Sequence, residues 1–254
     1  MIQKFQVQPH KRNRPVPLCK ATVNATFQDP KNQEPLKANV PYRSAIGAIL
    51  YLSVCTRPEL AYAISTLASF NSNPRTCHWK AVKELLSYIH STQDVGITYG
   101  KHIDDDINKL SIYADADYAS AHTKRRSRGG YIIFMNGGPI EWHSSLQPKI
   151  SLCTSESELY AMVSACKQGK YIKNFLQTLG YPQSNINCYE DNKGALDWLT
   201  NGRSSSRMRQ LETEAYWLRQ EVVEDRIFTI HHISTEFQKA DFLTKCIQDH
   251  FTLS

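Results

Sequence analysis

The sequence predicts an α/β fold in which a mixed sheet is flanked by helices and preceded by a small, mainly helical segment. Two observations carry this prediction. From about residue 109 onward, patterns typical of strands and helices follow in the order three strands, helix, strand, two helices, strand and helix. Before that, apolar residues recur at helical spacing. We therefore expect a helical segment over residues 41–105 and a sheet domain over residues 106–254.

The composition is that of a globular protein with a sizeable core. The chain has 254 residues, of which 41% are hydrophobic and 21% charged, and this excludes a disordered chain. The net charge of +6 suits a polyanionic partner. The seven cysteines form no Cys-x-x-Cys pair, which argues against a disulfide framework or a zinc site and indicates reduced thiols.

The sequence also bears on where the protein acts. The chain does not begin with the long apolar core of a signal peptide, and its most apolar segment, residues 45–54, is too short to span a bilayer. We therefore expect an intracellular protein, cytoplasmic or nuclear, that is not secreted and has no membrane partner.

The first part of the chain divides into an arm and three helices. Residues 1–40 are polar and contain several prolines, so we expect a loosely ordered arm. A first helix is expected over 42–55. A second begins at Pro58, because proline is favourable in the first helical turn. A third is expected over 76–92, where large apolar residues recur at helical spacing.

Strand patterns begin after the third helix. A short strand is expected over 96–100, followed by a polar linker over 101–108. Runs of β-branched and aromatic residues bounded by glycine, serine and asparagine then indicate the strands of the sheet. These strands are expected at residues 110–118, 129–136, 139–144, 186–190 and 227–233.

A long helix is expected over residues 156–179. Ser155 is placed to cap it, Glu158 to complete a capping box, and Gly180 follows its end. Further helices are expected at residues 192–200, 208–224 and 237–247.

Four acidic residues stand at the junctions of these elements. Asp115 lies near the end of the first strand of the sheet, Glu158 in the long helix, Asp191 directly after the fourth strand, and Asp241 in the last helix. Hard divalent cations need several carboxylate oxygens brought together from distant parts of the chain. This ordered set indicates a metal-dependent nuclease.

The first acid has two competing explanations. On a strand, Tyr113, Asp115 and Asp117 share one face, so the two acids could simply be the solvated side of an edge strand. Tyr113-Ala-Asp-Ala also resembles a polymerase Tyr-x-Asp-Asp motif. That motif needs adjacent acids in a hairpin and a third acid on an upstream strand, whereas the preceding residues are typical of helices.

The other three acids have structural alternatives as well. Glu158 fits the acid of a capping box, although its neighbours on the helix face are apolar and favour an orientation toward the sheet. Asp191 can cap the helix that follows it. Asp241 is favourable near a helix N-terminus for dipole reasons alone. The functional interpretation therefore rests on the order of the four acids and not on any one of them.

Short motifs around these acids add a resemblance to a known family. They are Tyr-Ala-Asp-Ala-Asp-Tyr (113–118), Arg-Ser-Arg-Gly-Gly-Tyr (126–131), Ser-Glu-Ser-Glu-Leu-Tyr (155–160), Tyr-Glu-Asp-Asn (189–192) and Ala-Asp-Phe-Leu-Thr-Lys (240–245). In this order they resemble the C-terminal part of a copia-type LTR-retrotransposon Pol polyprotein, whose last domain is ribonuclease H. Upstream, residues 42–53, 56–59 and 78–81 resemble the segment that joins reverse transcriptase to ribonuclease H.

The resemblance implies a ribonuclease H-like fold, a five-stranded mixed sheet flanked by helices. It also implies that Asp115, Glu158, Asp191 and Asp241 are catalytic and bind two Mg²⁺ ions, for which Mn²⁺ can substitute. The implied activity is hydrolysis of the RNA strand of an RNA/DNA hybrid by two-metal-ion phosphodiester cleavage. The reverse transcriptase portion of the same polyprotein is an implied partner.

The family pattern decides between neighbouring acids. Asp115 is preferred over Asp117 because the first acid of the family ends the core strand and is followed by a small residue. Glu158 is preferred over Glu156 because the family glutamate precedes a hydrophobic-x-Ala sequence, here residues 159–161.

Basic residues near these motifs are candidates for contacts to nucleic-acid phosphates. One group lies in the first hairpin turn and the other before the third helix of the sheet domain, and each could equally be solvated surface charge. They are Lys124, Arg125, Arg126, Arg128, Arg203, Arg207 and Arg209.

Two departures from the family pattern support an alternative function. Residues 209–212 read Arg-Gln-Leu-Glu where the family usually has Lys-His-Ile-Asp, and no histidine precedes Asp241 in the loop 234–238. His231 and His232 lie earlier, on the expected strand, and are interpreted as structural. The alternative is a catalytically inactive or co-opted fragment that acts as a nucleic-acid-binding or interaction module. An integrase-like relative of the same fold agrees less well with the sequence, because the helix over residues 211–224 and the motif at residues 240–245 resemble ribonuclease H.

Overall fold

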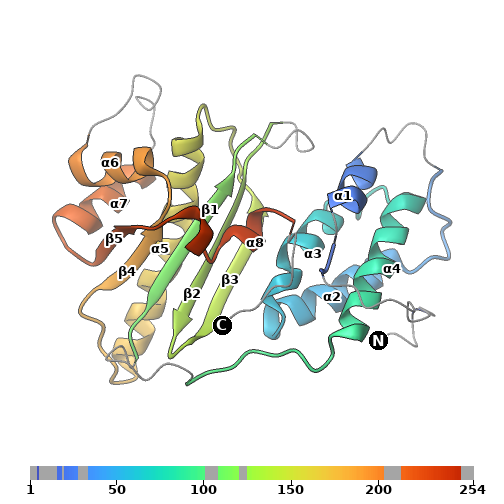
Figure 1. The fold of residues 1–254 in the computed structure, drawn as a ribbon, viewed down its shortest axis with the longest axis horizontal. Helices are drawn as coiled ribbons and strands as arrows, with labels where there is room; N and C mark the ends of the chain where they lie inside the picture. Colours follow the sequence, from blue (N-terminus) through green and yellow to red (C-terminus); the bar gives the residue numbers. More distant parts are fainter. Residues whose placement is uncertain are drawn as a thin grey trace. The chain divides into compact units, whose positions relative to one another are not determined.

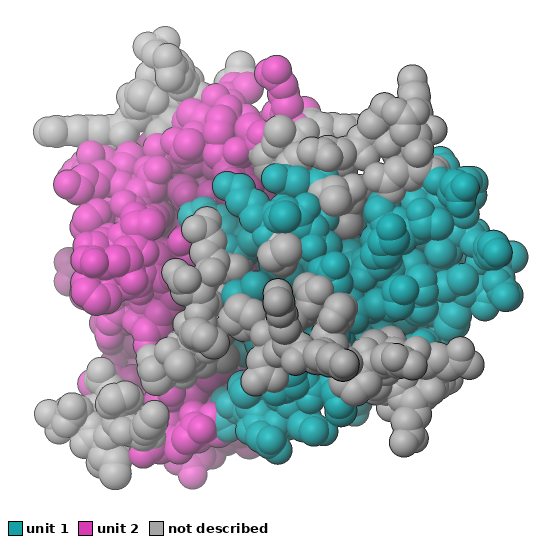
Figure 2. Space-filling model, turned by 45° about the vertical axis from the view of Figure 1, so that its right-hand side comes forward, with its two compact units in different colours: residues 1–97, 245–253 teal, residues 98–244, 254 magenta. Residues whose placement is uncertain are grey.

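The computed structural model describes residues 5, 16–18, 20–27, 34–100, 108–119, 125–202 and 213–246. The chain forms two compact units (Figure 2). The first unit comprises residues 1–97 and 245–253, and the second comprises residues 98–244 and 254.

The first unit is helical around its own apolar core. The helices expected at 42–55, from Pro58 and over 76–92 are confirmed. A further short helix lies within the region expected to be a loosely ordered arm, and Val23 of this helix is buried against the same core. The elements are α1 (Lys20–Phe27), α2 (Tyr42–Cys55), η3 (Pro58–Leu60), α3 (Ala61–Ala68) and α4 (Thr76–Ser91).

The second unit contains a five-stranded mixed sheet (Figure 1). Its strands lie in the order β3-β2-β1-β4-β5. The first three strands pair antiparallel, while β1 pairs parallel to β4 and β4 parallel to β5. The strands are β1 (Ser111–Asp117), β2 (Arg128–Met135), β3 (Gly138–Leu146), β4 (Ile186–Glu190) and β5 (Phe228–His232).

Helices cover both faces of this sheet (Figure 1). The long helix packs over β1 and β2, where Gly169 lies so close to Ile112 that a Cβ would overlap with the isoleucine side chain. The last short helix packs against the opposite face of β1 and β2. The elements are α5 (Thr154–Thr178), α6 (Lys193–Asn201), α7 (Thr213–Val223), η6 (Thr235–Phe237) and α8 (Asp241–Thr244). The expected ribonuclease H-like fold, a mixed sheet flanked by helices and preceded by a helical segment, is confirmed.

Two expected elements are wrong. Residues 96–100 form no strand; they are irregular and are joined to the β2–β3 turn by a hydrogen bond from the Gly100 N–H to the Asn136 carbonyl. The helix expected over 237–247 is replaced by η6 and by α8. The chain is extended at Gln238, whose side-chain amide donates to the Ala114 carbonyl of β1. This tertiary hydrogen bond interrupts the helical pattern.

Two further expectations can be compared with the described residues. No helix among them is both long enough and apolar enough to cross a bilayer. None of the six cysteines in this part of the chain forms a disulfide, and the sulfur atoms of Cys166 and Cys188 lie 3.8 Å apart in the core.

Candidate metal centre

Asp115 lies near the end of β1, and it is only 2% exposed. In the sheet it pairs with Gly130 of β2. A Cβ at Gly130 would lie 2.6 Å from the Cβ of Leu243, so glycine at this position lets α8 approach the sheet closely. From α8, the Thr244 hydroxyl donates a hydrogen bond to Oδ2 of Asp115. The strand backbone and α8 together fix the orientation of this carboxylate.

The close approach at Gly130 leads to a prediction about stability. Gly130→Ala is expected to lower the free energy of unfolding by about 1–3 kcal/mol, because α8 must move away from the sheet. Thermal and denaturant unfolding would measure this loss. Gly96→Ala is the matched control, because no atom lies within 4 Å of a Cβ at Gly96. Equal stability of the two variants would contradict close packing of α8.

Glu158 lies in the first turns of α5 and is only 7% exposed. Its Oε2 is buried without a hydrogen-bond partner. The pKa of the Glu158 carboxyl is raised to about 11, mainly by burial and then by the negative charges of nearby acids, Glu190 foremost, while a backbone hydrogen bond from Ala116 acts in the opposite direction. A buried carboxyl among like charges fits a cation ligand.

The expected capping box at the start of α5 is wrong. The N-cap residue is Cys153, and Ser155 lies inside the helix, where its hydroxyl donates to Oδ1 of Asn192. The acid that accepts a hydrogen bond from the backbone before the helix is Glu156, whose Oε2 accepts from the Leu152 N–H at 2.5 Å. The helix begins earlier than the sequence indicated, so the structural alternative for Glu158 does not hold.

Asp191 directly follows β4 and is half-buried. The cap of the next helix is the neighbouring Asn192, whose Oδ1 accepts from the Ala195 N–H at 3.0 Å. The carboxylate of Asp191 instead accepts a hydrogen bond from the Thr235 hydroxyl at 2.8 Å. The capping role considered for Asp191 therefore belongs to the next residue.

The fold brings three of the four expected acids together. Asp115, Glu158 and Asp191 each offer a carboxylate oxygen within 4.8 Å of the other two. Three carboxylates at this spacing repel one another unless a cation lies between them. Oxygen donors from carboxylates are the ligands that Mg²⁺ and Mn²⁺ prefer. The donor set and the unpaired buried oxygen of Glu158 therefore fit a hard divalent cation.

Asp241 is not part of this group of three in the described structure. It is the first residue of α8 and is half-buried. Its carbonyl accepts a hydrogen bond from the Thr244 hydroxyl, the same hydroxyl that donates to Asp115. Asp241 is thus connected to the group through Thr244, and its role as a metal ligand stays a prediction.

Sequence reasoning missed another acid near this group, Glu190, at the end of β4. It is fully buried; its Oε1 accepts from the Asn192 N–H at 3.0 Å, and its Oε2 has no partner. The pKa of Glu190 is raised to about 8, because burial and the charges of Asp191 and Asp115 together outweigh two backbone hydrogen bonds that lower it. A signal was present, because Ile186, Cys188 and Glu190 alternate with more exposed residues.

Three of the seven candidate phosphate contacts lie among the described residues. Arg125 is exposed, in a turn with a φ of 64°. Arg126 donates from Nε to the Gln147 carbonyl at 2.8 Å, and Arg128 is only 4% exposed and donates to the Ser144 hydroxyl at 3.4 Å. The remaining candidates, Lys124, Arg203, Arg207 and Arg209, lie outside the described residues.

A row of rings that sequence reasoning also missed crosses the sheet beside the acids. Tyr113 stacks on Tyr189 with centroids 4.6 Å apart, and Tyr189 stacks on His231 at 5.4 Å. Lys239 lies over the Tyr113 ring, 5.7 Å from its centroid. His231 also lies 3.2 Å from Oδ1 of Asn187, and it belongs to this row and not to the acidic group.

Comparison with known sequences gives several relatives, although no protein-family profile matches the chain. The Pol polyprotein of transposon TNT 1-94 from tobacco is 37% identical over 210 residues, or 83% of this chain. The Pol polyprotein of transposon RE2 from Arabidopsis thaliana is 33% identical over 207 residues. This chain spans only 15% and 14% of those two polyproteins. The secreted RxLR effector protein 161 of Plasmopara viticola is 41% identical over 134 residues, 92% of that protein.

Comparison with solved structures gives ribonucleases H. A ribonuclease H1, LC11, isolated from compost, matches 54% of this chain and 93% of its own length, with 16% identity and a TM-score of 0.42. The same ribonuclease in complex with an RNA/DNA hybrid matches 53% of this chain, with 15% identity and a TM-score of 0.39.

Proposed function

We propose, on the premise that this chain belongs to the copia-type retrotransposon Pol polyproteins, that its sheet unit is a ribonuclease H domain that hydrolyses the RNA strand of RNA/DNA hybrids. The observation that carries this proposal is the group of carboxylates from β1, α5 and the end of β4, with oxygens within 4.8 Å of one another. The chain spans only a small part of each of these polyproteins. That this chain is active by itself is therefore part of the proposal.

In the proposed site, Asp115, Glu158 and Asp191 hold divalent cations, and Asp241 completes the set from α8. Two Mg²⁺ ions, or Mn²⁺ in their place, supply activation of a water and stabilisation of the leaving oxygen. Residues of the chain orient the carboxylates that would hold these ions. Thr244 holds Asp115, and Thr235 holds Asp191. The burial of Asp115 and Glu158 strengthens their interaction with a cation.

The proposed substrate and partners follow from charge and from family membership. The net charge of +6 favours a polyanion. The exposed Arg125, next to β2, is a candidate phosphate contact among the described residues. We expect the reverse transcriptase portion of a Pol polyprotein to be a partner and the activity to be intracellular.

The test is cleavage of a labelled RNA/DNA hybrid by the purified chain with Mg²⁺. Asp191→Asn is the inactive variant, and Asp197→Asn is its matched control, because Asp197 is an exposed acid on the neighbouring helix α6. We expect cleavage by the wild type and by Asp197→Asn, with 5′-phosphate and 3′-hydroxyl ends, and loss of cleavage in Asp191→Asn and in EDTA. Equal rates for the two variants would contradict the assignment of Asp191.

A second candidate is an inactive nucleic-acid-binding or interaction module. The observation that favours it is the match to 92% of a relative much shorter than a Pol polyprotein. In the same experiment, a folded protein that binds the hybrid without cleaving it in Mg²⁺ or Mn²⁺ would favour this candidate.

A further inference from the structure

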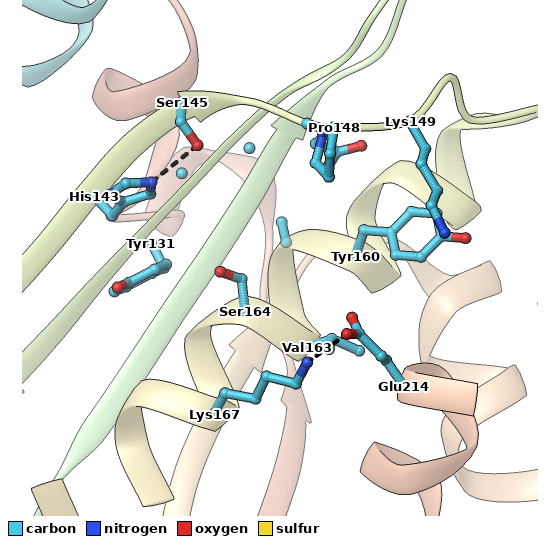
Figure 3. Close-up of a pocket in the computed structure, with 14 residues that line it drawn as sticks. Tyr131, His143, Ser145, Pro148, Lys149, Tyr160, Val163, Ser164, Lys167 and Glu214 are labelled. Carbon is cyan, nitrogen blue, oxygen red and sulfur yellow. Dashed lines mark hydrogen bonds and ion pairs between the residues drawn. The ribbon is translucent and has the colours of Figure 1, made fainter. Parts of the chain in front are cut away.

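A cavity of about 250 Å³ lies between the sheet and α5, on the face of the sheet opposite α8 (Figure 3). Its walls come from β2, β3, α5 and the start of α7. None of the carboxylates of the candidate metal centre lines it. The cavity is therefore a separate feature of the sheet unit, and the proposed metal chemistry does not account for it.

Aromatic rings form two sides of the cavity. On the side of the strands, the rings of Tyr131 and His143 stack with centroids 5.6 Å apart and an angle of 25° between their planes. On the side of α5, the ring of Tyr160 faces the same opening (Figure 3). Desolvation, and then the charge of Arg128, lower the pKa of His143, which favours the neutral form of its ring. Neutral rings on two sides suit a planar, aromatic ligand.

Polar groups lie between these rings. The hydroxyl of Ser164 points into the opening from α5, and the hydroxyl of Ser145 lies 2.9 Å from Nε2 of His143 (Figure 3). A hydroxyl both donates and accepts hydrogen bonds, so these two side chains can pair with the edge of a heterocycle. The cavity thus combines ring faces with hydrogen-bonding edges.

Two lysines give the opening a positive rim. Lys149 and Lys167 both line the cavity, and Lys167 lies one turn of α5 after Ser164 (Figure 3). Lys167 forms an ion pair with Glu214 at 2.7 Å, in which the side chains are 47% and 54% exposed. Because such exposed pairs contribute little free energy, Lys167 is available to exchange Glu214 for a doubly charged phosphate.

We propose that this cavity binds a single nucleotide, with the base between the rings of Tyr131 and Tyr160 and the phosphate at Lys149 and Lys167. The volume lies just below the range of roughly 300–1,000 Å³ typical of small-molecule sites, which fits one nucleotide and excludes a longer segment. The ligand is either a free mononucleotide or an unpaired nucleotide at the end of a strand. The inference goes beyond the proposed nuclease and does not depend on it.

The test is calorimetric titration of the whole chain, without metal, with adenosine 5′-monophosphate, adenosine and inorganic phosphate. Ser164→Trp fills the opening from an exposed position of α5, and Asn174→Trp adds the same side chain at another exposed position of α5 away from the cavity. We expect the monophosphate to bind, Ser164→Trp to weaken its binding at least about tenfold, and Asn174→Trp to leave it unchanged.

Lys167→Ala provides a second variant that leaves the core intact. We expect it to weaken binding of the monophosphate about two- to fivefold and to leave binding of adenosine unchanged. Absence of binding to the wild type, equal affinities for the two tryptophan variants, or phosphate binding as tightly as the monophosphate would each overturn the proposal.

Short metal-free hybrids distinguish the two sources of the nucleotide. Tighter binding of a hybrid with one unpaired terminal nucleotide than of a blunt hybrid, with the difference lost in Ser164→Trp, would identify a strand end. Equal binding of the two hybrids, with binding of the monophosphate retained, would identify a free nucleotide. Because no metal is present, failure of the nuclease proposal leaves this experiment unaffected.

Discussion

Asp115→Asn is expected to lower the rate of hybrid cleavage by at least about a thousandfold, the equivalent of several kcal/mol of transition-state stabilisation. The reason is that Asp115 belongs to the group of three acids whose oxygens all lie within 4.8 Å of one another. Asparagine keeps the shape of the side chain but removes its charge, and a neutral amide is a weaker ligand for a hard cation. Steady-state cleavage of a labelled hybrid in Mg²⁺ would measure the loss.

The substitution is expected to leave the fold intact. Asparagine retains an oxygen that can accept the hydrogen bond from Thr244. It also removes a negative charge from a crowded group of acids in the metal-free protein. We therefore expect Asp115→Asn to match the wild type in thermal stability without metal and in binding of the hybrid, so that a lost rate reports on chemistry alone.

Asp117→Asn is the matched control for this prediction. Asp117 lies on the same strand and the same face, two residues further on, but it is half-exposed and lies outside the group of three acids. We expect its cleavage rate to stay within severalfold of the wild-type rate. A large loss in Asp117→Asn with little change in Asp115→Asn would show that the first metal ligand is assigned to the wrong acid.

Much of the sheet unit could be predicted from sequence because its elements have strong local patterns. Strand β4 has the predicted bounds, 186–190, because alternation of buried and more exposed residues persists through all five positions. The long helix was predicted to within two residues at its start and one at its end. The acids at Asp115, Glu158 and Asp191 come together because these elements are adjacent in the sheet and its covering helix.

The remaining features depend on contacts between distant residues. The start of α5 was misplaced because Ser155 binds Asn192, 37 residues away, and does not cap its own helix. The last helix is short because Gln238 binds the backbone of β1. Glu190 was missed because a glutamate at the end of a strand is usually solvated, whereas this one is completely buried. The two hydrogen bonds join distant residues and leave no local pattern, whereas the alternation along β4 was the one local signal for Glu190.

The largest loss of stability is expected in the helical unit, for Arg57→Ala. Arg57 and Glu59 form an ion pair at 2.6 Å, with side chains only 6% and 4% exposed. Two further nitrogens of the guanidinium donate to the carbonyl and the hydroxyl of Thr92, at 3.1 and 2.7 Å. Arg57 thus joins the start of η3 to the end of α4. Its guanidinium also lies over the Tyr88 ring.

Arg57→Ala is expected to lower the free energy of unfolding by about 3–5 kcal/mol at pH 7, because it leaves a buried, uncompensated carboxylate. Burial already raises the pKa of Glu59 above its usual value, with Arg57 acting in the opposite direction. Without Arg57 this pKa rises further. Below the unfolded pKa of about 4.3, Glu59 is protonated in both states and the penalty vanishes, so the loss is expected to shrink toward about pH 4.

Two comparisons separate this mechanism from a simple loss of hydrogen bonds. Arg43→Ala removes an exposed arginine whose Nε donates to the Asn71 carbonyl at 2.9 Å, and it should cost no more than about 1 kcal/mol. Adding Glu59→Leu to Arg57→Ala should recover part of the loss, since the unpaired acid is then gone. Hydrogen exchange of peptides from α2 and α4 would assign the change to this unit. If the double variant were less stable than Arg57→Ala at pH 7, the buried charge would not be the cause.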